Sequence, residues 1–314
     1  MHPLSAEILA KRQVRKTKKQ KAEFEAFLIG ALRDAGYADA RAEEAGSLVK
    51  CRNIVAGDPD RAKVIYTAHY DTCAVLPVPN FITPTRPLIW ILYQILLVLG
   101  IFLIASACAT LVWLLPVGED LADMLAHLVY LAVLWFEIIW MVAGKANKHT
   151  ANDNTSGVIT LLEIALALPE ERRSEVCFVW FDHEESGLFG SMGFREKHKQ
   201  AAKETLTLNF DCVSDGDHML FVLPKKMKDD PLRDILGACF PSREGIESVF
   251  THTGKAVYPS DQTQFKRGIG VAALKKSRYL GLYMDRIHTA EDTVFEEKNI
   301  EFLANGAIAL AERV

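Results

Sequence analysis

The chain has 314 residues, a formal net charge of -4 and a 50% share of hydrophobic residues, so it can bury a large core. This charge balance gives no support to a nucleic-acid partner, which favours an excess of Lys and Arg. The six cysteines are scattered and include no C-x-x-C pair, which argues against a disulfide framework or a cysteine zinc site and favours reduced thiols in a cytosol.

The N-terminal region is basic and then amphipathic. The stretch "KRQVRKTKKQK", from Lys11 to Lys21, precedes "AEFEAFLIGALRDAG", which has the apolar spacing of a surface helix. Because no apolar core with a cleavage site follows the basic residues, we expect no secretory signal peptide. The basic segment can contact anionic lipid headgroups or form a solvated helix face, and both interpretations stay open.

Two long apolar runs follow the first predicted strand, "AKVIYTAHYD". One extends from Pro87 to Pro116 without a charge, and the other from Met124 to Gly144, with "VGEDLAD" between them. An apolar helix of about 20 residues spans the ~30 Å hydrocarbon layer. We therefore predict a transmembrane helical hairpin at residues 84–145, in contact with the bilayer through residues 88–143. The alternative is a buried hairpin or a dimerisation arm of a soluble protein.

The charges that flank the hairpin predict its orientation. Three basic residues lie where its two ends rejoin the body: Arg86, Lys145 and Lys148. The connecting link carries acidic residues and no Lys or Arg, so the body and both termini of this two-helix, multi-pass membrane protein should face the cytoplasm. Glu137, inside the second run, is costly in lipid and should reach the interface or face a protein-lined cavity.

The remaining residues, about 250, have the size of one α/β domain. Strand patterns at 62–71, 175–185, 205–213 and 219–223 alternate with helical patterns at 155–169, 187–198 and 299–314. Such alternation predicts a mixed, mostly parallel central sheet with helices on both faces. We divide the chain into an N-terminal helix and the first part of this domain (1–83), the hairpin (84–145), and the rest of the domain (146–314).

Metal-binding residue types recur where the predicted strands end. They are His69 and Asp71, Asp182 to Glu185, and Asp211, joined by Asp153 in "ANDNTSG" and His288 in "RIHTAEDT". Ligands of parallel strands meet at one edge of a sheet. A hydrolytic site with two metal ions requires imidazole nitrogens and carboxylate oxygens as ligands. It also requires one further carboxylate that accepts a proton from the attacking water. Glu184 and Glu185 can divide these two tasks because neighbouring side chains point in different directions.

The motifs "HYD", "NDNTSG", "DHEESGLFGS", "NFDCV" and "HTAEDT", in this order and spacing, resemble the zinc aminopeptidases of the M28 metallopeptidase family. The resemblance extends from about Asn53 to the C-terminus and implies a three-layer α/β/α sandwich. The five implied metal ligands are His69 and Asp211 for the first zinc ion, Glu185 and His288 for the second, and Asp153 as a bridge between both.

The resemblance also implies the other roles at the site. Glu184 would be the general base that deprotonates a metal-activated water, and Asp71 would orient the His69 imidazole. His183 receives no ligand role and is expected in a local hydrogen bond or in solvent. Asp261 is a candidate for holding the substrate amine, although a turn role explains it equally well.

The oxyanion donor is not fixed by the sequence. Relatives often supply a tyrosine or a similar donor, and the sequence does not select among Tyr258, Tyr279 and Tyr283. Stabilisation of the oxyanion by the metals alone stays an alternative.

The resulting expectation is a membrane-anchored metalloprotease of the aminopeptidase type, with two zinc ions and peptide substrates. Two alternatives stay open: a glutaminyl-cyclase-like acyltransferase with one zinc ion, and a non-catalytic membrane scaffold of the same fold. The hairpin is inserted between "HYD" and "NDNTSG", so we expect the site close to the membrane, with access limited to short peptides. The oligomeric state is left open.

Overall fold

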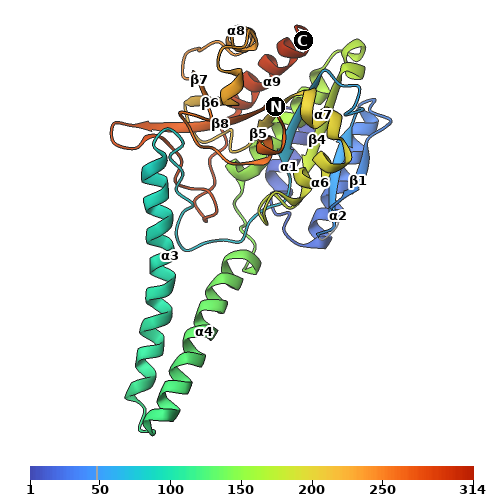
Figure 1. The fold of residues 1–314 in the computed structure, drawn as a ribbon. Coiled ribbons are helices and arrows are strands. Elements are labelled where there is room, and N and C mark those ends of the chain that lie inside the picture. The colour runs from blue at the N-terminus through green and yellow to red at the C-terminus, as the bar shows by residue number, and fades with distance from the viewer. Residues whose placement is uncertain (47–48) are drawn as a thin grey trace.

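The computed structural model describes residues 1–46 and 49–314, which form a body and a long protruding hairpin (Figure 1). The strands of the body are β1 (Arg41–Ala45), β2 (Cys51–Ala56), β3 (Val64–His69), β4 (Val176–Phe181), β5 (Leu206–Phe210), β6 (His218–Leu223), β7 (Glu247–His252), β8 (Gly268–Ser277) and β9 (Gly281–Tyr283). Short helical turns lie at Leu111–Leu114, Ala151–Ser156, Glu170–Glu175, Lys225–Met227 and Asp261–Gln264.

The sheet has the order β1-β2-β4-β3-β5-β8-β6-β7, and β9 pairs with β8. Its central strands β4, β3, β5 and β8 are parallel to one another. The flanking pairs β2 with β4 and β6 with β8 are antiparallel. The carboxyl ends of β3, β4 and β5 therefore meet at one edge, which confirms the predicted mixed sheet with a parallel centre.

Helices cover both faces of this sheet. On one face α1 (Pro3–Lys11), α2 (Lys18–Asp34), α5 (Gly157–Ala167), α8 (Leu232–Cys239) and α9 (Glu297–Ala311) contribute to the largest apolar cluster. On the other face α6 (Phe189–Lys197) and α7 (Lys199–Glu204) pack through a smaller cluster that contains Phe194 and Ala201. This is the three-layer α/β/α arrangement that the motifs imply.

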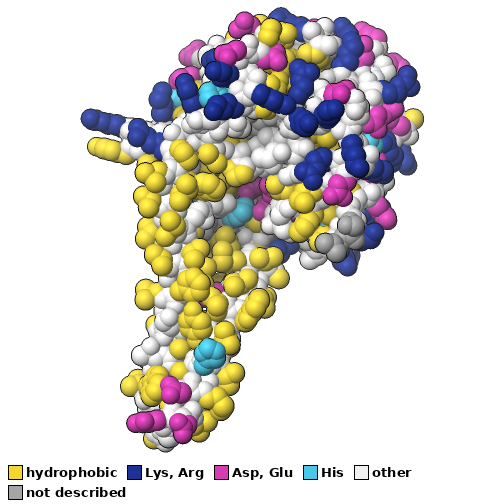
Figure 2. All heavy atoms as spheres, in the orientation of Figure 1, with side chains coloured by type: hydrophobic (Ala, Val, Ile, Leu, Met, Phe, Trp, Pro, Cys, Tyr) yellow, Lys and Arg dark blue, Asp and Glu magenta, His cyan; other side chains and the backbone are white. Residues whose placement is uncertain are grey.

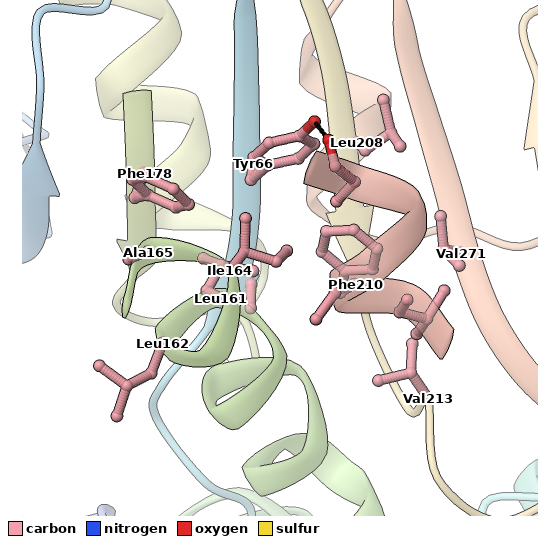
Figure 3. Packing of buried hydrophobic residues seen from close by; sticks show 14 of the residues in the cluster. Tyr66, Leu161, Leu162, Ile164, Ala165, Phe178, Leu208, Phe210, Val213 and Val271 are labelled. Atoms are coloured by element: carbon pink, nitrogen blue, oxygen red, sulfur yellow. Dashed lines mark hydrogen bonds between the residues drawn. The ribbon is translucent and has the colours of Figure 1, made fainter. Parts of the chain in front are cut away.

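The main core lies between the central strands and α5 and α9 (Figure 3). β3 and β4 are buried along their whole length, as the continuous apolar runs of central parallel strands require. Tyr66 extends its ring into this core and its hydroxyl donates to the carbonyl of Ala307, 2.6 Å away. The phenol thus links β3 to α9 without leaving a buried polar atom unpaired.

The basic N-terminal segment is partly structural, which its sequence did not indicate. Arg15 is fully buried and its Nε donates to the carbonyl oxygen of Tyr70 at 2.5 Å. The Lys21 ammonium lies 2.6 Å from a carboxylate oxygen of buried Asp182. These two cations therefore hold the N-terminal helices on the sheet, and the expectation that the whole segment faces lipid headgroups or solvent is wrong for them.

The hairpin consists of α3 (Pro87–Thr110), the turn Leu111–Leu114 and α4 (Glu119–Ala143). Both helices are long and apolar enough to cross a membrane, and only 11% and 0% of their most apolar windows are buried. Figure 2 shows hydrophobic side chains covering the hairpin, while charged side chains gather on the body. This exposure argues against the alternative of a buried core hairpin.

One hairpin boundary differs from the prediction. The polar link was expected to extend through Asp123, but α4 already begins at Glu119. Glu119 and Asp120 lie in its first turn, where carboxylates interact favourably with the helix dipole. The connection between the two helices is therefore shorter than the sequence suggested.

Both ends of the hairpin are fixed beside the end of β3. The amide of Val75 donates to the carbonyl of Lys145 at 2.8 Å, and the amide of Asn147 donates to the carbonyl of Cys73 at 3.2 Å. The segment that leaves β3 toward α3 thus pairs with the segment that returns from α4. This pairing places the base of the hairpin next to the sheet edge that carries His69.

The core predicts a strong effect of one substitution in β4. Phe178 is fully buried, with ring centroids 5.8 Å from Tyr37 and 5.9 Å from Tyr66. Phe178→Ala should lower the free energy of unfolding by about 3–5 kcal/mol, because it removes these contacts and leaves a cavity. Urea unfolding in detergent, followed by circular dichroism, measures this change. Tyr279→Ala, at a side chain that is 74% exposed, should change it by less than about 0.5 kcal/mol; equal losses would contradict this packing.

Candidate metal centre

The predicted site residues lie at the sheet edge where three parallel strands end. His69 is the last residue of β3, Glu184 and Glu185 follow β4, and Asp211 follows β5. Asp153 lies in the turn Ala151–Ser156, between the hairpin and α5. His288 comes from the loop after β9. The structure thus brings together residues that are far apart in the sequence.

Three of these residues form a first cluster. The Nε2 atom of His69 lies 3.2 Å from Oδ1 of Asp153 and 3.5 Å from Oδ1 of Asp211. All three side chains are buried, and one potential ligand atom from each lies within 4.8 Å of the others. Such spacing around a common centre is compatible with a single bound cation.

A second cluster lies on the other side of Asp153. Nε2 of His288 is 3.0 Å from Oδ2 of Asp153 and 3.1 Å from Oε2 of Glu185. Within residues 1–46 and 49–314, the other carboxylate oxygen of Glu185 is buried without a hydrogen-bond partner. Asp153 therefore directs one carboxylate oxygen toward each of the two imidazoles.

Cys73 joins the second cluster, which the sequence did not predict. One ligand atom from each of Cys73, Glu185 and His288 lies within 4.8 Å of the other two. A lone cysteine in a loop carries no spacing signal, so only the pairing of the hairpin ends reveals its position. Its thiol is buried next to the two candidate ligands.

The donor set fits zinc. Two imidazoles with three carboxylates are typical nitrogen and oxygen ligands of this ion. The buried, unpartnered oxygen of Glu185 is a second sign, because a carboxylate oxygen in that position costs free energy unless a cation or a donor reaches it. His69 also donates through Nδ1 to the carbonyl of Asp71 at 3.1 Å, which leaves Nε2 free to face Asp153 and Asp211.

The carboxylate of Asp71 mainly holds the turn after β4. Its two oxygens accept hydrogen bonds from the amides of Glu184 at 3.0 Å and Glu185 at 3.3 Å. The same carboxylate lies 3.7 Å from Nδ1 of His69, farther than the Asp71 carbonyl. Asp71 thus orients the adjacent glutamates directly and the imidazole chiefly through its backbone.

The charges around the site shift the pKa values of its acids in opposite directions. Burial raises the pKa of Glu184 well above its usual value, and Asp211 and Asp261 add to this effect while His69 opposes it. Burial would also raise the pKa of Asp153, but hydrogen bonds from His288 and His69 hold it below its usual value. The ionised form of the Asp153 carboxyl group is thereby favoured, whereas Glu184 retains its proton to a higher pH than an ordinary glutamate.

Asp292, in the motif "HTAEDT", holds the backbone at Asp153. Its carboxylate accepts the amides of Asn152 at 2.8 Å and Asp153 at 2.9 Å. Burial and the charge of Asp153 raise the pKa of Asp292 to about 7. The sequence placed Asp292 in a motif but gave it no role, because the contact becomes apparent only after folding.

Three further residues singled out in the sequence lie near the site: His183, Asp261 and Tyr258. His183 lies 3.0 Å from the ammonium of Lys21 and 3.1 Å from the hydroxyl of Ser186, in the kind of local contact expected for it. Asp261 is fully buried, and neither of its carboxylate oxygens has a partner in the described part of the chain. The hydroxyl of Tyr258 donates to the carbonyl of Asp211 at 3.0 Å, which occupies it structurally.

The chain belongs to peptidase family M28, whose model matches residues 138–312. This range is shorter than the resemblance inferred from the motifs, and it does not include His69 and Asp71. A stretch of 83 residues is 36% identical to a probable leucine aminopeptidase of Arthroderma otae and covers 24% of this chain and 23% of that protein. The match therefore spans less than a quarter of the curated relative.

Solved structures share the fold. Glutaminyl cyclase of Porphyromonas gingivalis superposes with a TM-score of 0.61 at 15% identity, over 99% of this chain and 97% of that one. The LapA aminopeptidase of Legionella pneumophila gives a TM-score of 0.55 at 13% identity, over 98% and 69%. At such low sequence identities the similarity concerns the fold alone. Because both an aminopeptidase and a glutaminyl cyclase share this fold, the similarity does not distinguish between the two activities.

The contacts of Asp292 predict its effect on metal affinity. Asp292→Asn places a side-chain amide group against the backbone amides of residues 152 and 153, so the backbone that carries the candidate ligand Asp153 loses a support. The zinc affinity should fall by about 10- to 100-fold, as measured by competition with a chromophoric chelator. Glu291→Gln, at an exposed neighbour, should leave it unchanged. An unaltered affinity in a folded Asp292→Asn variant would contradict this positioning role.

Proposed function

We propose that the protein is a membrane-anchored dinuclear zinc aminopeptidase that removes N-terminal residues from peptides. The observation that carries the proposal is the position of Asp153, with one carboxylate oxygen 3.2 Å from the imidazole of His69 and the other 3.0 Å from that of His288. Membership of a peptidase family supports hydrolysis of an amide bond.

The ligands follow from the two clusters. His69 and Asp211 would hold one zinc ion, Glu185 and His288 the other, with Asp153 shared between them. Zinc bound there supplies a Lewis acid that polarises the scissile carbonyl and lowers the pKa of a water molecule. The thiol of Cys73 is close enough to Glu185 and His288 to affect how these two residues bind a metal ion.

Glu184 is the proposed general base. Its backbone amide is fixed by Asp71, and its side chain lies in the field of His69, Asp211 and Asp261 without being one of the five proposed ligands. A carboxylate in this position takes a proton from the attacking water and passes it to the leaving amine. The adjacent Glu185 binds metal, so the two glutamates have separate tasks.

The preference for N-terminal residues rests on Asp261. This carboxylate is fully buried beside the site, and its two oxygens lack partners among the described residues. The α-ammonium group of a peptide would supply the missing donors and a compensating charge. An internal peptide bond offers no such cation, which favours cleavage at chain ends.

Membrane anchoring is the second part of the proposal. Two exposed apolar helices of sufficient length and a base that carries Arg86, Lys145 and Lys148 support a hairpin inserted from the cytoplasmic side. The body, with both termini, would then lie in the cytoplasm, and the link at Leu115–Gly118 on the opposite side. The proposed site would face the membrane surface.

Substitutions at two adjacent residues distinguish the proposed general base, Glu184, from the proposed metal ligand, Glu185. Glu184→Gln should retain two zinc ions per chain and lose nearly all hydrolysis of an aminoacyl anilide, on the order of 10²–10⁴-fold, because only proton transfer is removed. Glu185→Gln, its matched control, should lose one zinc ion. Elemental analysis and amino acid release measure both effects.

The same measurements distinguish the alternatives. One zinc ion per chain, with loss of ammonia from a peptide that begins with glutamine, would show a glutaminyl cyclase. Stable protein with neither zinc nor turnover would favour a non-catalytic scaffold.

The orientation can be tested with single cysteines. Val117→Cys lies in the exposed link, and Glu244→Cys on the exposed surface of the body. In intact cells a membrane-impermeant maleimide should label residue 117 and reach residue 244 only after permeabilisation. The unsubstituted protein, with its native cysteines, sets the background. Labelling of both positions from the same side would contradict a membrane-spanning hairpin.

A further inference from the structure

A cavity of about 480 Å³ lies between the hairpin and the body. Its walls come from the loop at residues 76–80 and from both hairpin helices, including Leu97, Ile101 and Trp140, and His288 also lines it. Figure 2 shows a hollow where the hairpin meets the body, with histidine and acidic side chains inside it. The cavity therefore connects an apolar region between α3 and α4 with a proposed metal ligand.

The cavity borders a second pocket that lies at the candidate metal centre. A smaller pocket of about 210 Å³ is lined by Asp71, Cys73 and Glu185. The two cavities share Leu76, Met141 and His288. A molecule in the hairpin cavity would thus have one end beside the residues proposed to catalyse hydrolysis.

The two hairpin helices contribute two polar side chains to the otherwise apolar surface that they give the cavity. Glu137 of α4 and Gln94 of α3 both line the cavity, and Oε2 of Glu137 is buried without a hydrogen-bond partner in the described chain. An intramembrane carboxyl group is costly unless a partner satisfies it, and such residues mark functional sites in membrane proteins. The occupant of the cavity should therefore offer hydrogen-bonding groups as well as apolar surface.

We propose that this cavity binds the apolar segment of the peptide substrate that follows the scissile bond, and that Glu137 pairs with its backbone. The inference rests on the proposed aminopeptidase function and names its substrate class as peptides with apolar residues behind the N-terminus. A peptide backbone offers donors and acceptors at every residue, whereas a lipid acyl chain has none for Glu137 or Gln94. This difference favours a peptide over lipid.

The helix geometry indicates which peptide residues are bound. Met141 borders both cavities, and Glu137 lies one helical turn earlier on α4. The four residues from Glu137 to Met141 correspond to a rise of about 6 Å along the helix, or about two residues of an extended chain. If the scissile bond lies in the smaller pocket, beside Met141, Glu137 reaches the peptide about two residues beyond that bond. Dipeptides would not extend that far.

Binding is measured on the Glu184→Gln protein in nanodiscs, so that the peptide is not consumed. The probe is a fluorescent hexapeptide with a free amino terminus and apolar residues at positions two to five. Gly100→Leu fills the cavity, because Gly100 lines it and no heavy atom lies within 4 Å of an added Cβ. Leu103→Phe, at a lipid-facing side chain that is 70% exposed, is the matched control.

The dissociation constant should rise at least tenfold with Gly100→Leu and about tenfold with Glu137→Leu, which corresponds to one lost hydrogen bond. Glu137→Gln keeps the hydrogen-bonding capacity and should stay within about threefold. Leu103→Phe should have no effect. A polar hexapeptide of equal length should bind more weakly than the apolar one.

Equal affinities for all variants, or for both peptides, would overturn the proposal. Copurified phospholipid that is lost with Gly100→Leu while peptide binding persists would also overturn it, since lipid would then be the occupant. Hydrolysis of an aminoacyl anilide by the protein with native Glu184 is a separate readout. Its failure would reject the aminopeptidase function, while the binding data would still decide what the cavity holds.

Discussion

The fold concentrates acidic side chains at one edge of the sheet. Four buried aspartates surround the imidazoles of His69 and His288, namely Asp71, Asp153, Asp211 and Asp261, and the adjacent Glu184 and Glu185 complete the group. Two imidazoles cannot neutralise so many carboxylates, whose burial disfavours their ionised forms. Bound divalent cations would do so, and they would invert the local preference for protonation. The parallel centre of the sheet makes this concentration possible, because β3, β4 and β5 deliver their last residues to the same place.

The position of the hairpin links this edge to the proposed membrane anchor. The chain leaves the sheet after His69, forms α3 and α4, and returns beside its point of departure, where Val75 pairs with Lys145. The return segment leads directly into Asp153 and α5. A proposed ligand thus lies on each side of the inserted element in the sequence, and a third, His288, lines the cavity that contains Glu137. In this arrangement the same insertion that would anchor the protein also shapes the route to its site.

The sequence predicted those parts whose signals are local. The apolar runs of β3, β4 and β5 and the helical spacing of α5 and α9 placed the main elements, and the acids that follow the strands placed the candidate ligands. Short or polar strands escaped prediction. β1, with the sequence "RAEEA", has too many charged residues for a strand pattern, and β9 has only the residues Gly281–Tyr283. Such strands form because a neighbour supplies hydrogen bonds, which propensity alone does not reveal.

Contacts between distant segments were equally hidden. The burial of Arg15 and Lys21 depends on partners that directly follow β3 and β4, and the place of Cys73 depends on the pairing of the hairpin ends. Asp292 supports Asp153 across the fold, although its motif in the sequence gave no sign of this contact.

The most direct test of the account is the location of bound metal. Anomalous diffraction, recorded on both sides of the zinc absorption edge from crystals grown with zinc, should show two peaks about 3.5–4 Å apart, with the carboxylate of Asp153 between them. One peak should lie next to His69 and Asp211, and the other next to Glu185 and His288. A single peak, or peaks away from Asp153, would contradict the dinuclear centre.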